Sequence, residues 1–79
     1  MERTVEEMVE SWVGELADLV SVSASTVQDR LFDLWGALAE GDTRREVERW
    51  LTETLERELY LVEDVVDRLN ELVMVARVG

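Results

Sequence analysis

The chain has 79 residues and a net charge of −11, with 19 acidic side chains against eight basic ones, all Arg, and no His, Cys, Lys or Pro. Without His or Cys it lacks the common nucleophiles, proton shuttles and soft metal ligands, so we expect no catalytic residue, no metal site and no cofactor. The acidic charge argues against nucleic acid and anionic membranes as partners, and it favours cationic partners or a concentrated salt solution.

The length limits the chain to a single domain, residues 1–79. Hydrophobic residues make up 47% of it and recur at helical spacing. We therefore expect an all-α fold, a small helical bundle made of a helical hairpin and a long or kinked C-terminal helix. No apolar run approaches the length of about 18 residues needed to span a membrane, and no signal-peptide pattern is found, so we expect a cytoplasmic protein.

The first helix is predicted from about Thr4 to Val20. Apolar residues recur there every three or four positions, which places them on one face of a helix. Thr4 and Glu7 have the spacing of a capping box, in which the threonine side chain accepts a hydrogen bond at the helix start. The sequence therefore predicts both the presence of this helix and its first residue.

A serine-rich segment, residues 21–25, interrupts the apolar pattern, because serine favours turns and caps over helix interiors. The second helix is predicted from Thr26 to Glu40, with Ser23 or Ser25 as its N-cap. Gly41 follows at the position where glycine commonly ends a helix.

The C-terminal part has two interpretations. Thr43 and Glu46 form a second possible capping box, and the apolar residues after them keep one helical phase to about Ala76. Because Leu59 to Val62 contain no helix breaker, the pattern favours one helix from about residue 44 to 75. The alternative is two helices joined by a tight turn near those four residues. We find no convincing internal repeat.

Between residues 15 and 31 a small residue, a turn residue, a Val-Ser step and an apolar residue follow one another at fixed spacing: Ala17, Ser21, Val22-Ser23 and Val27. The stretch from Glu15 to Leu31 resembles a helix-turn-helix module. The resemblance implies a second helix that faces the DNA major groove through four side chains: Ser25, Thr26, Gln28 and Arg30. The charge argues against it, because Arg30 is the only cation between residues 21 and 40.

Two further groups of side chains stand out. Three tryptophans, one in each expected helical region, are candidates for the core or for interface anchors: Trp12, Trp35 and Trp50. Three arginines form the single basic cluster, for which we expect acidic partners in the same chain or in a second subunit: Arg44, Arg45 and Arg49.

The apolar faces are wider than three short helices can bury, so we predict a homo-oligomer that packs its C-terminal helices together. Six residues are the candidate interface: Leu59, Leu61, Val62, Val66, Leu69 and Val73. The function predicted from this is a non-enzymatic interaction module of regulatory or adaptor type, which binds itself and another protein with a basic or apolar groove. The alternative is a helix-turn-helix transcription regulator.

Overall fold

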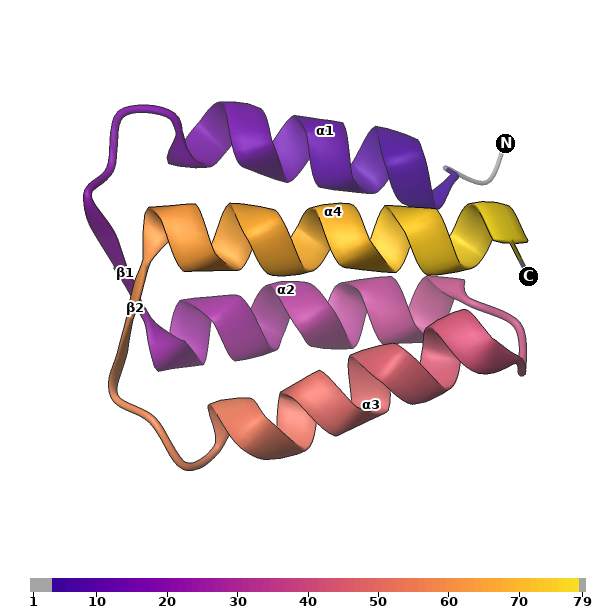
Figure 1. Ribbon diagram of the computed structural model, residues 1–79. Coiled ribbons are helices and arrows are strands. Elements are labelled where there is room, and N and C mark those ends of the chain that lie inside the picture. The colour runs from indigo at the N-terminus through magenta and orange to yellow at the C-terminus, as the bar shows by residue number, and fades with distance from the viewer. Residues whose placement is uncertain (1–3, 79) are drawn as a thin grey trace.

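The computed structural model describes residues 4–78 and consists of four helices joined by short connections and two very short strands (Figure 1). The elements in chain order are α1 (Val5–Leu16), β1 (Ser21–Ser23), α2 (Ala24–Ala37), α3 (Asp42–Thr54), β2 (Leu59–Leu61) and α4 (Val62–Val78). The predicted all-α bundle is therefore confirmed.

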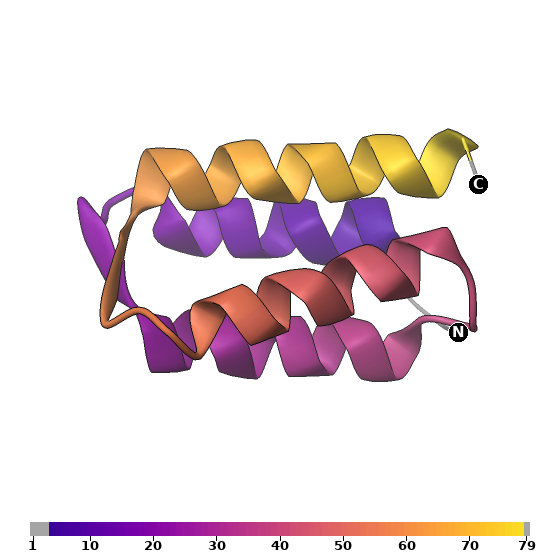
Figure 2. The ribbon, with the colours of Figure 1, turned by 60° about the horizontal axis from the view of Figure 1, so that its bottom comes forward.

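The helices pack in pairs, α1 against α4 and α2 against α3, and α3 also contacts α4 (Figures 1 and 2). The hairpin of the bundle is thus formed by α2 and α3. At one end of the bundle the two strands cross between the pairs as an antiparallel ribbon, in which Val22 lies opposite Tyr60. This ribbon ties the first half of the chain to the second.

The helix starts follow local capping signals. Thr4 caps α1, where its hydroxyl accepts a hydrogen bond from the Glu7 amide at 3.2 Å, as predicted. Ser23 caps α2 in the same way through the Thr26 amide at 3.3 Å. The predicted capping box at Thr43 is wrong, because α3 already begins at Asp42, one residue earlier.

Of the two interpretations of the C-terminal part, the structure has the one with two helices. Helix α3 ends at Thr54, and residues 55–58 lead into β2, which runs directly into α4. No local breaker is needed, because the backbone of residues 59–61 pairs with residues 21–23 far away in the sequence. A tertiary pairing of this kind overrides helical propensity.

One hydrophobic core receives side chains from all four helices and from β1. Trp12 and Trp50 are both buried in it, at 6% and 3% exposure, and Trp35 packs partly buried against its edge. Each fully buried Leu or Val stabilises the fold by about 1.5–3 kcal/mol, which lets a chain without disulfides fold. The core is thus completed inside one protomer.

The two halves of the chain repeat one another, which the sequence analysis missed. Each element after residue 40 starts close to 38 residues after its counterpart: Leu59 against Ser21 for the strands, and Val62 against Ala24 for the helices that follow. Nine residues are identical at this spacing within the helices: Val9/Val47, Glu10/Glu48, Trp12/Trp50, Glu15/Glu53, Val27/Val65, Asp29/Asp67, Arg30/Arg68, Leu31/Leu69 and Leu34/Leu72.

The contacts at the ribbon and those of the two helix pairs repeat as well, whereas the packing of α3 on α4 has no counterpart of similar extent between α1 and α2. The Ala24 amide bonds to the Glu58 carbonyl at 3.0 Å, and the equivalent Val62 amide bonds to the Val20 carbonyl at 3.2 Å. The central ribbon pair, Val22 and Tyr60, joins two equivalent positions. The protein is therefore two helix–strand–helix units, related by an approximate twofold axis through this pair.

Candidate interaction surfaces

The largest concentration of exposed apolar side chains lies at the ribbon. Seven large hydrophobic residues are exposed in the described part of the chain, and four of them belong to β2 or to the two positions before β1: Leu19, Val20, Leu59 and Leu61. We call these four residues the ribbon-end surface. The core is complete without them, so nothing within the protomer requires them to be apolar.

Strand alternation explains how β2 presents its leucines. Val22 and Tyr60 turn toward the core, at 6% exposure for Val22, and their neighbours along each strand face outward. Leu59 and Leu61 are 64% and 57% exposed. In β1 the equivalent outward residues are both serine. The fold therefore accepts polar residues at positions where β2 carries leucine.

Acidic residues flank the ribbon-end surface in the sequence. Five exposed acids lie within three residues of the strands, and none forms an ion pair with another described residue: Asp18, Glu56, Glu58, Glu63 and Asp64. The nearby cation in the sequence is Arg57, whose guanidinium lies 5.8 Å from the centre of the Tyr60 ring. The surface thus has an apolar centre and a negative rim.

The six predicted interface residues divide into three groups. Leu59 and Leu61 are exposed and belong to the ribbon-end surface. Three valines are half-buried: Val62, Val66 and Val73. Leu69 is only 1% exposed, so its assignment to an interface is wrong. Helix α4 lies in contact with α1 and α3, and this packing covers Leu69 within the same chain.

The residues expected to face DNA do not form a cationic surface. Ser25 and Thr26 are exposed at the start of α2, where their hydroxyls contact the capping Ser23, the closer at 2.7 Å. Arg30 is bound to Glu15 at 2.5 Å, which neutralises the one cation of the set. Gln28 is half-buried beside Phe32, in a groove between α2 and α3.

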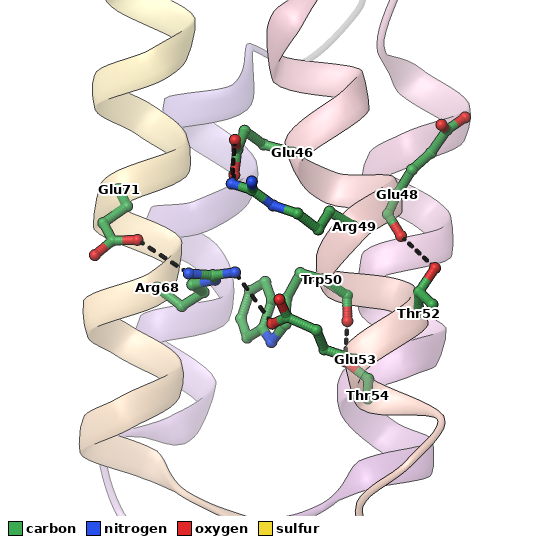
Figure 3. A network of polar contacts seen from close by, with 9 residues as sticks. All are labelled: Glu46, Glu48, Arg49, Trp50, Thr52, Glu53, Thr54, Arg68 and Glu71. Atoms are coloured by element: carbon green, nitrogen blue, oxygen red, sulfur yellow. Dashed lines mark hydrogen bonds and ion pairs between the residues drawn. The ribbon is translucent and has the colours of Figure 1, made fainter.

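A network of polar contacts covers the second half of the bundle between α3 and α4 (Figure 3). Arg68 donates to Glu53 at 3.1 Å and to Glu71 at 3.4 Å, and its guanidinium lies 5.9 Å from the centre of the Trp50 ring. Arg49 is paired with Glu46 beside it. Of these contacts, those of Arg68 with Glu53 and Trp50 join α4 to α3 at the surface.

The predicted basic cluster is used within the chain. Arg44 stacks on Trp35 at 4.0 Å, and the Trp35 indole donates to Glu48 at 2.9 Å. Arg45 lies 3.8 Å from Asp42 on the same helix. Arg45 and Arg49 are thus paired with acids of the same helix, and Arg44 packs on an aromatic ring.

A hydrogen bond and ion pair from Arg77 to Glu6 join the end of α4 to the start of α1. The hydrogen bond, and then the negative charges of Glu6 and Glu10, raise the pKa of Arg77 above its usual value. Arg77 is a cation at neutral pH with or without this shift, so the contact is structural.

Two kinds of site are missing from the described residues. Residues 4–78 contain no group of three or more acidic, His or Cys side chains placed to hold a metal ion. Their helices include none with the length and apolar character of a membrane span.

Comparison with known proteins gives no match to a protein family, to a curated protein or to a solved structure.

Proposed function

We propose that the protein is a non-enzymatic interaction module, and that its ribbon-end surface binds an apolar and cationic segment of a partner protein. One observation carries this proposal: β2 exposes Leu59 and Leu61 where the equivalent positions of β1 are Ser21 and Ser23. The second unit therefore has exposed apolar residues at positions where the first unit has polar residues and still folds in the same way. Exposed apolar residues inside a polar rim are typical of a protein-binding site.

The charge favours a cationic partner over a second copy of the chain. Two copies meeting at this surface would bring their acidic rims together, at −11 per chain, and the repulsion would be relieved only in concentrated salt. A segment with basic residues around an apolar centre would instead gain attraction from the same rim. Self-association through Leu59 and Leu61 is therefore the competing outcome.

A protein whose chemistry is confined to a binding surface acts by holding partners, which is the role of an adaptor or regulatory protein. The helix-turn-helix alternative depends on Arg30, which the Glu15 carboxylate already neutralises. DNA binding would thus need this ion pair to open. We keep duplex DNA as one arm of the test.

The test compares two variants of equal charge with the unmodified protein. The probe is a short synthetic helix of Leu and Lys, labelled for fluorescence anisotropy. Leu59→Ser with Leu61→Ser copies the outward residues of β1, so this variant keeps a strand that the fold accepts. We expect it to weaken binding about tenfold or more, equivalent to about 1.4 kcal/mol.

Phe32→Ser is the matched control, because Phe32 is similarly exposed, at 52%, but lies on α2 outside the ribbon-end surface. We expect this control to bind the probe like the unmodified protein. Equal binding by all three proteins would show that charge alone attracts the probe and would refute the proposal. Sedimentation equilibrium tests self-association, and binding of random duplex DNA that requires Arg30 would favour the transcription regulator instead.

A further inference from the structure

A cavity of about 150 Å³ lies between α1, α2 and α4, away from the ribbon. Its lining is largely apolar and includes Met8, Val9, Trp12, Leu34 and Leu69, from all three helices. A dry apolar cavity of about this volume is known to hold benzene. The cavity is open to the surface, so its size suits one ring-sized group that enters from solvent.

The second unit of the protein shows what covers the equivalent place. There the hollow is lined by Glu46, Arg49, Arg68 and Glu71, and it does not reach the buried Trp50. Arg49 is paired with Glu46, and Arg68 lies over the Trp50 ring (Figure 3). Arg68, together with the Arg49–Glu46 pair, thus covers the Trp50 ring, although the hollow outside it is larger than the first, at about 340 Å³.

The first unit lacks this cover, because Met8 and Ser11 stand where the second unit has Glu46 and Arg49. The cavity therefore extends down to Trp12. Its arginine, Arg30, contacts Glu15 at 2.5 Å, and no contact between Arg30 and Trp12 corresponds to that of Arg68 with Trp50 in the described residues. Arg30 thus lines the cavity without stacking on the Trp12 ring, and Arg49 has no cationic counterpart in the first unit.

The mouth of the cavity also carries an acid that lacks the cation its counterpart has. Asp33 lines the cavity and makes no ion pair with a described residue, whereas the equivalent Glu71 is paired with Arg68 at 3.4 Å. The charges of Arg30 and Glu15 offset each other. A positively charged ligand would therefore meet the Asp33 carboxylate without displacing an existing partner.

We propose that this cavity binds a small organic cation, in which an ammonium or guanidinium group is attached to an apolar part about the size of a benzene ring. The apolar part lies against Trp12 and Leu69, and the cation lies beside Asp33 and the Ser11 hydroxyl. One ring fills the available volume, so recognition is completed within the cavity and needs no extended protein partner. The proposal is separate from the ribbon-end surface and does not depend on it.

Binding is measured by NMR titration, with the Trp12 indole N–H signal as the local probe. The ligands are benzylguanidinium, its neutral isostere benzylurea, and the anion phenylacetate. We expect benzylguanidinium to bind saturably and at least about tenfold more tightly than benzylurea, a difference of about 1.4 kcal/mol, and phenylacetate not to bind. Equal binding of the cation and the neutral isostere, or no saturable binding of the cation, would overturn the proposal.

Three variants locate the site. Asp33→Asn removes the proposed contact at an exposed position, and we expect it to weaken benzylguanidinium about tenfold while benzylurea is unchanged. Glu71→Gln is the matched control in the second unit, where we expect no change. Met8→Glu with Ser11→Arg copies the cover of the second unit and should abolish binding, with circular dichroism as the check of folding. A cation that still binds Asp33→Asn as before would refute the assigned contact.

Discussion

Equivalent side chains in the two units allow the same interaction to be compared in two surroundings. Arg30 and Arg68 each bind the acid 15 residues earlier in the chain, Glu15 and Glu53. Arg30 is 45% exposed and has this one acidic partner, whereas Arg68 is 29% exposed, has a second partner and lies over a tryptophan ring. The more buried arginine should therefore contribute more, through packing as well as charge.

We expect Arg68→Ala to lower the free energy of unfolding by about 1–2 kcal/mol and Arg30→Ala by about 0.5 kcal/mol. Urea unfolding followed by tryptophan fluorescence and by circular dichroism measures both values. An equal loss in the two variants would show that neither packing on Trp50 nor the second acid adds to the ion pair.

Tyr60 provides a second prediction for a single residue. Its hydroxyl is buried and has no hydrogen-bond partner among the described residues, and the equivalent Val22 carries no polar atom. Burying an unpaired hydroxyl is unfavourable, so we expect Tyr60→Phe to raise the free energy of unfolding by about 1 kcal/mol. A loss of stability in the same urea experiment would mean that the hydroxyl has a partner.

At the scale of the elements, the two strand-to-helix junctions differ in their caps. Ser23 caps α2 through the Thr26 amide, but the equivalent residue before α4 is Leu61, which has no polar side chain. Helix α4 thus lacks a side-chain cap, because an exposed leucine stands at its N-cap position. Such a loss of stability is expected where a residue is kept for binding.

We expect Ser23→Ala to lower the free energy of unfolding by about 1 kcal/mol and Leu61→Ser to raise it by a similar amount. Differential scanning calorimetry of the two variants would show shifts of opposite sign in the melting temperature. If Leu61→Ser instead destabilised the protein, the leucine would have a structural role, and the argument for the ribbon-end surface would be weakened.

The elements that the sequence predicted are those with local signals. Thr4 and Ser23 mark helix starts through contacts with residues three positions later, so a short window contains the information. The break near Leu59 has no such signal, because it comes from pairing with Ser23 in the other half. The apolar pattern of residues 59–62 fits a helix equally well, and only the partner strand decides between them.

The repeat was visible in the sequence but obscured by common residue types. Six of the nine identical pairs are Leu, Val or Glu, which recur in any acidic helical protein. The specific signal is Trp12 with Arg30-Leu31 matching Trp50 with Arg68-Leu69 at one spacing. Missing it led to the wrong assignment of Leu69 to an interface, because α1 of the first unit, together with α3, supplies the burial that we attributed to another chain.

At the scale of the whole molecule, the net charge acts against the compact state. With 19 acids and eight arginines, the folded chain repels itself, and salt shortens the range of this repulsion from about 10 Å at 0.1 M to about 3 Å at 1 M. We expect the free energy of unfolding to rise by about 1–2 kcal/mol between these concentrations of NaCl. Glu56→Gln with Glu58→Gln makes the net charge less negative and should reduce this effect of salt. A free energy of unfolding that does not change with salt would contradict the argument.

The approximate twofold axis gives the last prediction. Since the second unit repeats the first, a chain that begins at Gly41, joins residue 79 directly to residue 1 and ends at Glu40 has the same order of elements as the original. The start of α1 and the end of α4 lie at one end of the bundle, where Arg77 contacts Glu6 (Figure 1). This circular permutant keeps every helix and strand intact and moves the break to the equivalent connection.

We expect the permutant to unfold in one cooperative transition, with a free energy of unfolding within about 2 kcal/mol of the original. Nuclear Overhauser contacts between Val22 and Tyr60 would show that the ribbon has re-formed. A control permutant that begins at Val22 and ends at Ser21 breaks the chain inside β1. We expect it to be much less stable, because one strand of the ribbon is then no longer continuous. If both permutants failed to fold, the two units would be alike in shape only, and the order of synthesis or of folding would matter more than the symmetry of their contacts.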